Sequence, residues 1–113
     1  MDNYCSLLDK KCVPCEGGMP PLTPEQLEPL FKEISGWSII DNKQIEKEYV
    51  FKNFTQSVSF INKIAEIAEA EGHHPDIFLH NYRKVKVTLS THAVHGLSEN
   101  DFILAAKIDT IQI

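Results

Sequence analysis

The clearest hydrophobic pattern in the chain runs over residues 55–72, TQSVSFINKIAEIAEAEG. One stripe of apolar side chains recurs at helical spacing and consists of Val58, Ile61, Ala65 and Ala68, with Phe60, Ile64 and Ile67 beside it. Gly72 follows these positions, and glycine often ends a helix because it tolerates the left-handed conformation. The pattern therefore predicts an amphipathic helix whose apolar stripe is broad enough to cover a sheet.

Alternating patterns on both sides of this helix predict strands. Residues 37–40 (WSII) and 45–51 (IEKEYVF) form two runs, and the DNK sequence between them favours a hairpin turn. In the second run, one face carries Ile45, Tyr49 and Phe51. Residues 76–92 return to strand character, and the apolar side chains that alternate there are Val85, Val87 and Leu89.

Two further helices are expected near the ends of the pattern. Residues 22–37 begin with a capping box and a helix-starting proline, supplied by Thr23, Pro24 and Gln26. Pro29 interrupts this helical pattern, and Gly36 ends it. Residues 98–113 predict a last helix that Ser98 caps, with apolar positions at Leu104, Ile108 and Ile111.

The resulting order, α-β-β-α-β-β-α, predicts an α+β fold in which a four-stranded antiparallel sheet has three helices packed on one face. A length of 113 residues with 42% hydrophobic residues is typical of one compact domain. The Gly and Pro pairs of EGGMPP mark a break before the regular pattern begins. We therefore expect a single domain over residues 22–113, preceded by an N-terminal tail over residues 1–21.

Cysteines occur only in this tail, at Cys5, Cys12 and Cys15. The CVPC spacing is shared by zinc knuckles and dithiol redox motifs. A structural zinc site needs four ligands, whereas the tail has three thiols and no histidine, and it lacks the βα context of a thioredoxin-like motif. The favoured interpretation is a flexible, reduced tail in which Cys12 and Cys15 face solvent.

Charge and hydropathy argue against two classes of partner, nucleic acids and membranes. The formal net charge is -5, and no run of Lys or Arg forms a basic stripe, so direct nucleic-acid binding is not expected. No apolar run approaches the ~18 residues of a membrane span. The first twelve residues are too charged, and too short in their apolar part, for a secretory signal. A cytoplasmic location without membrane contact is the default expectation.

Three histidines fall at the predicted ends of elements: His73 and His74 after the central helix, and His92 at the end of the last strand. Pro75 pushes His74 toward an extended conformation, so the two adjacent rings point in different directions. Three interpretations compete: a three-histidine metal site, structural caps of the helix terminus, and acid/base chemistry. Because the pair lacks helical i,i+4 spacing and a second ligand pair, no metal is expected, and acid/base chemistry is favoured.

Two acidic residues belong to the same neighbourhood, and each has a simpler explanation. Glu69 precedes His73 by four residues and could orient an imidazole, but a glutamate on this part of a helix usually faces solvent. Asp101 follows Ser98 by three residues, which is the spacing of a capping box. His80 and His95 have no evident partner and are interpreted as exposed loop or strand-edge residues.

Several separated motifs together resemble one known family. EGHHPD, the strand that ends in VTLSTH and the helix start GLSENDFILAAKID are similar in sequence and order to the pterin-4a-carbinolamine dehydratases, over residues 22–108. CVPCEGGMPPLT also resembles the N-terminal segment of some members. The resemblance implies an enzyme that dehydrates 4a-hydroxytetrahydropterin to quinonoid dihydropterin and water, and so recycles the pterin cofactor of aromatic amino-acid hydroxylases.

The resemblance also implies roles for residues and partners. His73, His74 and His92 would be the catalytic acid/base groups, and no metal or redox cofactor would be needed. The substrate-binding residues would be Gly72, Ser90, Thr91, Ala93, Asp101 and Glu69. A homodimer or homotetramer is expected, with a functional link to an aromatic amino-acid hydroxylase. The alternative function is a protein-binding one, because some animal members serve as dimerization cofactors of a homeodomain transcription factor without DNA contacts of their own.

Overall fold

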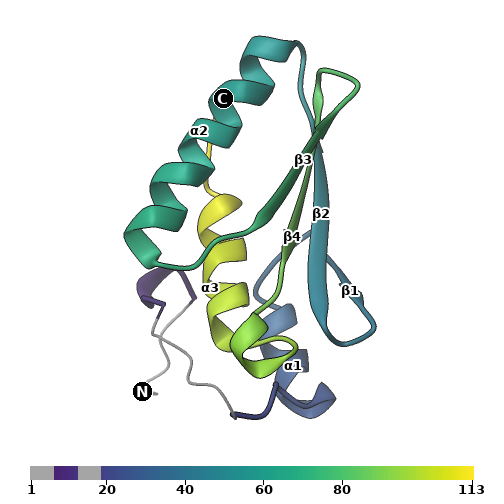
Figure 1. Cartoon of the computed structure of the whole chain (residues 1–113), viewed down its shortest axis with the longest axis vertical. Helices are drawn as coiled ribbons and strands as arrows, with labels where there is room; N and C mark the ends of the chain where they lie inside the picture. The colour runs from purple at the N-terminus through teal and green to yellow at the C-terminus, as the bar shows by residue number, and fades with distance from the viewer. Residues whose placement is uncertain (1–6, 13–18) are drawn as a thin grey trace.

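The computed structural model describes residues 7–12 and 19–113, and in that part of the chain one antiparallel sheet of four strands is covered on one face by three α-helices (Figure 1). Cys5 and Cys15 lie outside the described residues. The elements are η1 (Leu7–Asp9), α1 (Pro24–Phe31), β1 (Ser38–Ile40), β2 (Gln44–Val50), α2 (Phe54–Glu71), β3 (Asp76–His80), β4 (Lys84–Leu89), η2 (His92–Val94) and α3 (Glu99–Ile108). The predicted fold class and order of helices and strands are confirmed, and the two short 3-10 helices η1 and η2 are additions.

The sheet has the strand order β1-β2-β4-β3, so β4 lies between β2 and β3 and pairs with both. Both hairpins turn through pairs of residues with positive φ, at Asp41 and Asn42 and at Asn81 and Tyr82. Asn and Asp are the residues that adopt this conformation most easily after glycine. The predicted alternation holds, because Val85, Val87 and Leu89 of β4 are all buried beneath the helices.

Local signals explain where the helices begin and end. Thr23 and Gln26 form the predicted capping box at the start of α1. This helix ends at Phe31, two residues after Pro29, and the chain continues in tighter turns before Gly36. The α2 helix ends as predicted at Gly72, whose φ is 68°. In the described segments, no helix has the length and apolar character required to cross a membrane.

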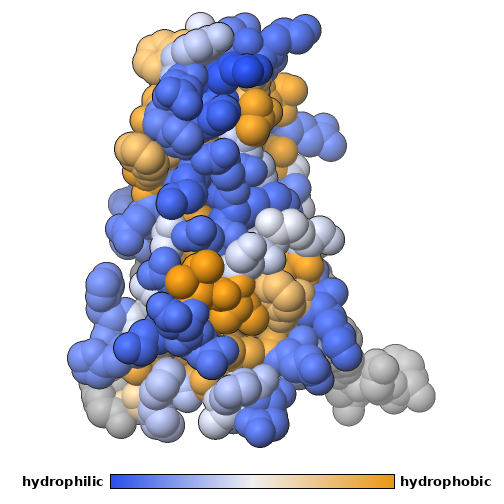
Figure 2. All heavy atoms as spheres, turned by 90° about the vertical axis from the view of Figure 1, so that its right-hand side faces the viewer, coloured by the Kyte–Doolittle hydropathy of each residue, from blue (hydrophilic) through white to orange (hydrophobic). Residues whose placement is uncertain are grey.

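The hydrophobic core lies between the sheet and the helices. Its largest fully buried side chains include Phe60 and Ile64 of α2, Phe102 and Leu104 of α3, and Ile45 of β2. The opposite face of the sheet is turned toward the viewer in Figure 2, where hydrophilic side chains surround smaller apolar patches. The helices therefore bury one face of the sheet and leave the other open.

The N-terminal segment departs from the sequence prediction. Leu7 and Cys12 are both buried members of the core, and η1 packs against α3. The expectation that Cys12 faces solvent is therefore wrong. The reason is tertiary, because apolar side chains of this segment find an apolar surface on a helix that lies almost ninety positions later in the sequence.

A polar cluster fixes the C-terminal end of α3 to the sheet. The Asp109 carboxylate accepts hydrogen bonds from Trp37 Nε1 at 2.9 Å, Lys47 Nζ at 2.8 Å and the Tyr49 hydroxyl at 2.6 Å. Burial raises the pKa of Tyr49 far above its ordinary value, and the hydrogen bond and charge of Asp109 raise it further, so this hydroxyl stays protonated and donates. Lys47 is a charged residue on the covered face of β2, where its Nζ atom donates to Asp109 and, at 2.7 Å, to the carbonyl of Ser35.

Replacing Asp109 by alanine tests this cluster. The Asp109→Ala variant leaves Trp37 Nε1 and the Tyr49 hydroxyl without their acceptor and removes one of the two acceptors of Lys47, and we expect the free energy of unfolding to fall by about 2–3 kcal/mol. Denaturant unfolding followed by circular dichroism measures the change. Glu28→Ala is the matched control, since Glu28 is an exposed acid on α1, and an equal loss in both variants would contradict the assigned role of Asp109.

Candidate active site

The end of α2 places His73 and His74 at the edge of the helical layer. The backbone N–H groups of Gly72 and His73 both donate to the carbonyl of Ala68, at 2.9 and 3.3 Å. The left-handed conformation of Gly72 then turns the chain away from the helix axis. His73 consequently reaches the first turn of α3, while His74 remains on the exposed side.

His73 is paired with a buried carboxylate. Its Nε2 atom lies 2.6 Å from Asp101 Oδ1, and the two side chains are 12% and 0% exposed. A carboxylate at Nε2 favours a proton on that nitrogen and leaves Nδ1 for proton exchange. The pair therefore has the arrangement of a catalytic imidazole that an acidic residue orients.

Asp101 also holds the segment that carries His92. Its second oxygen, Oδ2, accepts hydrogen bonds from Thr91 Oγ1 at 2.8 Å and from the backbone N–H of Ser98 at 3.0 Å. The contact with Ser98 belongs to the predicted capping box at the start of α3. Capping and site chemistry are therefore not alternatives for Asp101, because each of its oxygens serves a different one.

The loop after β4 is closed tightly between Thr91 and Gly96. The N–H of Thr91 donates to the Gly96 carbonyl at 2.8 Å, and the reverse bond measures 3.4 Å. His92 begins η2 within this loop, and His95 adopts a left-handed conformation with φ 57°. A Cβ atom at Gly96 would lie 2.7 Å from Cβ of Pro21, so the close approach of these two segments requires glycine.

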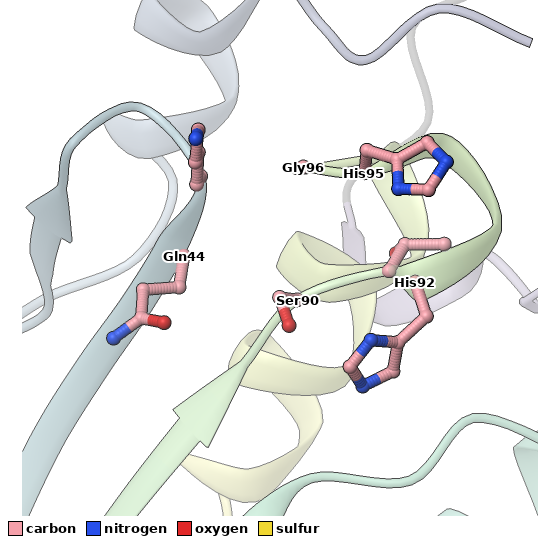
Figure 3. A pocket seen from close by; sticks show the side chains of 7 residues that line it. Gln44, Ser90, His92, His95 and Gly96 are labelled. Carbon is pink, nitrogen blue, oxygen red and sulfur yellow. The ribbon is translucent and has the colours of Figure 1, made fainter.

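A small cavity opens between this loop and the start of β2 (Figure 3). Its volume is about 150 Å³, and it is lined by Lys43, Gln44, Ser90, Thr91, His92, His95 and Gly96. In Figure 3, Gln44 extends from β2 on one side, while the rings of His92 and His95 lie on the opposite side. Local sequence signals do not indicate the contributions of Lys43, Gln44, His95 and Gly96. The pairing of Ile45 with Leu89 brings Lys43 and Gln44 to the cavity, and the Thr91–Gly96 bridge brings His95 and Gly96 there.

His74 has a different environment from His73. Its Nε2 atom lies 2.6 Å from Glu69 Oε2, but the two side chains are 62% and 77% exposed. Glu69 thus contacts an imidazole, as was considered possible, although the ring is that of His74 and not of His73. A pair so open to water contributes little to stability, so Glu69 restrains His74 only weakly.

The remaining predicted residues are distributed around this region. Ser90 and Thr91 line the cavity, whereas Ala93 lies in η2 and Gly72 between α2 and His73. His80 has a partner that the sequence did not reveal, since its Nε2 lies 2.7 Å from Glu48 Oε1 and its ring stacks on Phe78. Among residues 7–12 and 19–113, no three His, Cys, Asp or Glu side chains gather as a group that could hold a metal ion.

The pairing of Asp101 with three donors leads to a stability prediction. We expect Asp101→Ala to lower the free energy of unfolding by about 2–4 kcal/mol, because His73, Thr91 and Ser98 each lose a buried acceptor. Thermal or denaturant unfolding measures this loss. Asp76→Ala, at an exposed position of β3, serves as control, and a loss below about 1 kcal/mol for Asp101→Ala would contradict the described network.

Comparison with known proteins places the chain among relatives of similar length. The family described as Pterin 4 alpha carbinolamine dehydratase matches residues 20–111. A relative from Nitrosomonas eutropha, named "Putative pterin-4-alpha-carbinolamine dehydratase", is 47% identical and covers 100% of this chain and 99% of its own length. A relative of the same name from Nitrosospira multiformis is 50% identical, over 93% of this chain and 91% of its own.

Solved structures agree with this assignment. The "transcriptional coactivator/pterin dehydratase from Brucella Melitensis" has a TM-score of 0.73 and 32% identity, over 79% of this chain and 95% of that one. A pterin dehydratase-like protein described as a RuBisCO assembly factor in the alpha-carboxysome has a TM-score of 0.55 at 24% identity, over 66% of this chain and 86% of that one, and it supports the fold alone. From its match over residues 20–111 and its full-length relatives, the chain belongs to the pterin 4 alpha carbinolamine dehydratase family.

Proposed function

We propose that this protein dehydrates 4a-hydroxytetrahydropterin, with acid/base catalysis by His73, His74 and His92. The observation that carries the proposal is the His73–Asp101 pair, in which a buried carboxylate holds an imidazole and is bonded through Thr91 to the loop that bears His92. Membership of the dehydratase family supports the same reaction. Metal and redox cofactors have no part in this mechanism.

The chemistry matches the residue types. In a carbinolamine, one carbon carries both the hydroxyl group and a ring nitrogen. An acid protonates the hydroxyl so that the C–O bond breaks and water leaves, while a base removes the proton of the nitrogen and a C=N bond forms. Imidazoles exchange protons readily near neutral pH, so two or three of them around one flat ring can supply both groups.

The three histidines differ in exposure and in the partners that hold them, which suggests different contributions. Asp101 fixes the ring of His73, whereas Glu69 restrains that of His74 only weakly. His92 is exposed at the start of η2, beside the cavity of about 150 Å³. In the proposal, Ser90, Thr91 and Ala93 form part of the pocket wall, and Gly72, whose φ of 68° favours glycine, lines the open space at the end of α2 beside His73.

Turnover of chemically prepared carbinolamine by purified variants is the decisive experiment. We expect His73→Ala and His92→Ala each to lower kcat/KM by about 100-fold or more, and His74→Ala to lower it measurably. The losses in double variants should not add, because the residues act as a unit. His80→Ala is the control, since His80 pairs with Glu48 on β2 and is not part of the proposed machinery.

Two results of this assay would overturn the proposal. The first is wild-type turnover in all three alanine variants. The second is a loss of activity on treatment of the wild type with a chelator, which would point to a metal site in place of acid/base catalysis.

A protein-binding role is the second candidate function. The Brucella structure is described as both a transcriptional coactivator and a pterin dehydratase, and this chain is 32% identical to it. With a net charge of -5, this chain would act through protein contacts and not through DNA. If the purified protein lacks dehydratase activity and a second protein copurifies stably with it, this role is favoured over the enzymatic one.

The cellular setting follows from the proposed reaction. A cytoplasmic enzyme would recycle the pterin used by an aromatic amino-acid hydroxylase and would depend functionally on that hydroxylase.

We also propose a homodimer or homotetramer, because one face of the sheet is left open and an exposed Phe78 lies on the edge strand β3. Static light scattering should give a mass at least twice the 12.8 kDa of one chain. A mass of one chain across the working concentration range would contradict the proposed assembly.

A further inference from the structure

The N-terminal strap, defined here as residues 7–12, lies against the two helix ends that form the His73–Asp101 pair. Three consecutive strap residues, Lys10, Lys11 and Cys12, together contact both ends. Lys11 Nζ donates to the carbonyl of Ala70 at 3.4 Å, near the end of α2, and Lys10 Nζ lies 2.5 Å from Glu99 Oε2, at the start of α3. Cys12 reaches both helices. The strap therefore bridges the junction on which the catalytic pair depends.

Glu71 is the centre of this bridge. Its Oε1 atom accepts the backbone N–H of Cys12 at 2.8 Å, and its Oε2 atom accepts Lys107 Nζ of α3 at 2.5 Å. The Glu71 side chain is only 8% exposed. Burial by itself raises the pKa of Glu71, but the hydrogen bonds from Lys107 and Cys12 and the charges of Lys107 and Lys11 outweigh burial, so the pKa lies below its ordinary value. The carboxylate is therefore charged at neutral pH and links strap, α2 and α3 together.

Cys12 adds a second contact on the α3 side. Its Sγ atom lies 3.6 Å from the carbonyl oxygen of Asn100, the residue before Asp101. Burial, followed by the neighbouring charge and hydrogen bond of Glu71, raises the pKa of Cys12 to about 12. The thiol therefore stays protonated and donates to this carbonyl. Cys12 thus contacts Glu71, which directly precedes Gly72 and His73, and also Asn100, which directly precedes Asp101.

The anchoring of the strap makes these contacts firm. Leu7 is buried in the core, and its backbone N–H donates to Glu33 Oε1 at 3.1 Å. The strap is thus fixed at Leu7 by packing in the core and at Cys12 by the hydrogen bond to Glu71. A hydrogen bond of 2.6 Å between His73 and Asp101 depends on the spacing of α2 and α3, and small displacements of catalytic groups reduce rates steeply.

We propose that the N-terminal strap is a positioning element of the active site, which holds His73 against Asp101 by fixing the end of α2 and the start of α3 through Glu71 and Cys12. The strap residues do not touch the reacting atoms. They act through the spacing of the two helices, and Glu71 is the positioning residue whose loss has the largest effect. The inference rests on the proposed dehydratase function for its kinetic consequence, but its structural consequence can be observed without turnover.

Glu71→Ala and Glu71→Gln in the full chain test the proposal, with Glu66→Ala as control because Glu66 is an exposed acid on the same helix. The first readout is kcat/KM for the carbinolamine, measured well below the unfolding temperature. The second is the NMR signal of the hydrogen-bonded Nε2 proton of His73, which reports the pairing with Asp101 directly. We expect Glu71→Ala to lower kcat/KM about tenfold and to broaden or shift the proton signal. Glu71→Gln, which keeps an acceptor for the Cys12 N–H, should recover part of both.

The outcomes separate this inference from the proposed function. Absence of turnover in the wild type would defeat the function, while the His73 proton signal would still test the strap. Wild-type turnover together with a wild-type proton signal in Glu71→Ala would overturn the strap proposal. This holds even if the unfolding temperature of the variant is lower, because Glu71 would then contribute to stability alone. If Glu71→Ala does not fold, Cys12→Ala removes the Sγ contact with Asn100 and keeps the backbone N–H that Glu71 accepts, and wild-type values of both readouts in Cys12→Ala and in Glu71→Gln would overturn the proposal equally.

Discussion

The fully buried carboxylate of Asp101 is the constraint on which the arrangement of this site depends. A buried charge must be supplied with hydrogen-bond donors, and here three segments provide them: the end of α2 through His73, the loop after β4 through Thr91, and the start of α3 through Ser98. These donors can meet only if the three segments converge at the edge of the helical layer. The core packing of α2 and α3 on the sheet makes this convergence possible, since it fixes both helices against the same face of the sheet.

Local signals in the sequence were sufficient for the fold. Thr23 with Gln26, Gly72, and the alternation around Val87 are patterns within a few residues of one another, and each gave an element at the expected place. The end of a helix was harder to predict where a helix-breaking residue lies within a continuing apolar pattern. The Pro29 position is an example, because the helix stops at Phe31 even though the apolar pattern continues toward Gly36.

The sequence predicted individual residues of the site but not the contacts between them, because most of these contacts join residues far apart in the chain. The spacing of Ser98 and Asp101 indicated a cap, but the bond from Asp101 to His73 joins residues 28 positions apart and has no local signature. The same holds for His80 of β3 and Glu48 of β2, which meet across the intervening strand β4, and for Cys12, whose partners lie 59 and 88 positions away. A flexible tail was expected because the cysteine spacing lacked a full set of zinc ligands and a redox-motif context, yet burial was decided by the apolar surface of α3.

The contacts of the N-terminal strap also have a consequence for the order of events during biosynthesis. Lys10 meets Glu99 across 89 positions and Cys12 meets Asn100 across 88, so these strap residues bind partners that are synthesised much later. Until α3 has emerged, Leu7 and Cys12 have no helix to cover, and the apolar surface that they share with the core is open to solvent. The His73–Asp101 pair and the contacts of the strap can therefore form only after α3 has emerged, and a nascent chain that stalls before α3 exposes part of its core and lacks the carboxylate of Asp101.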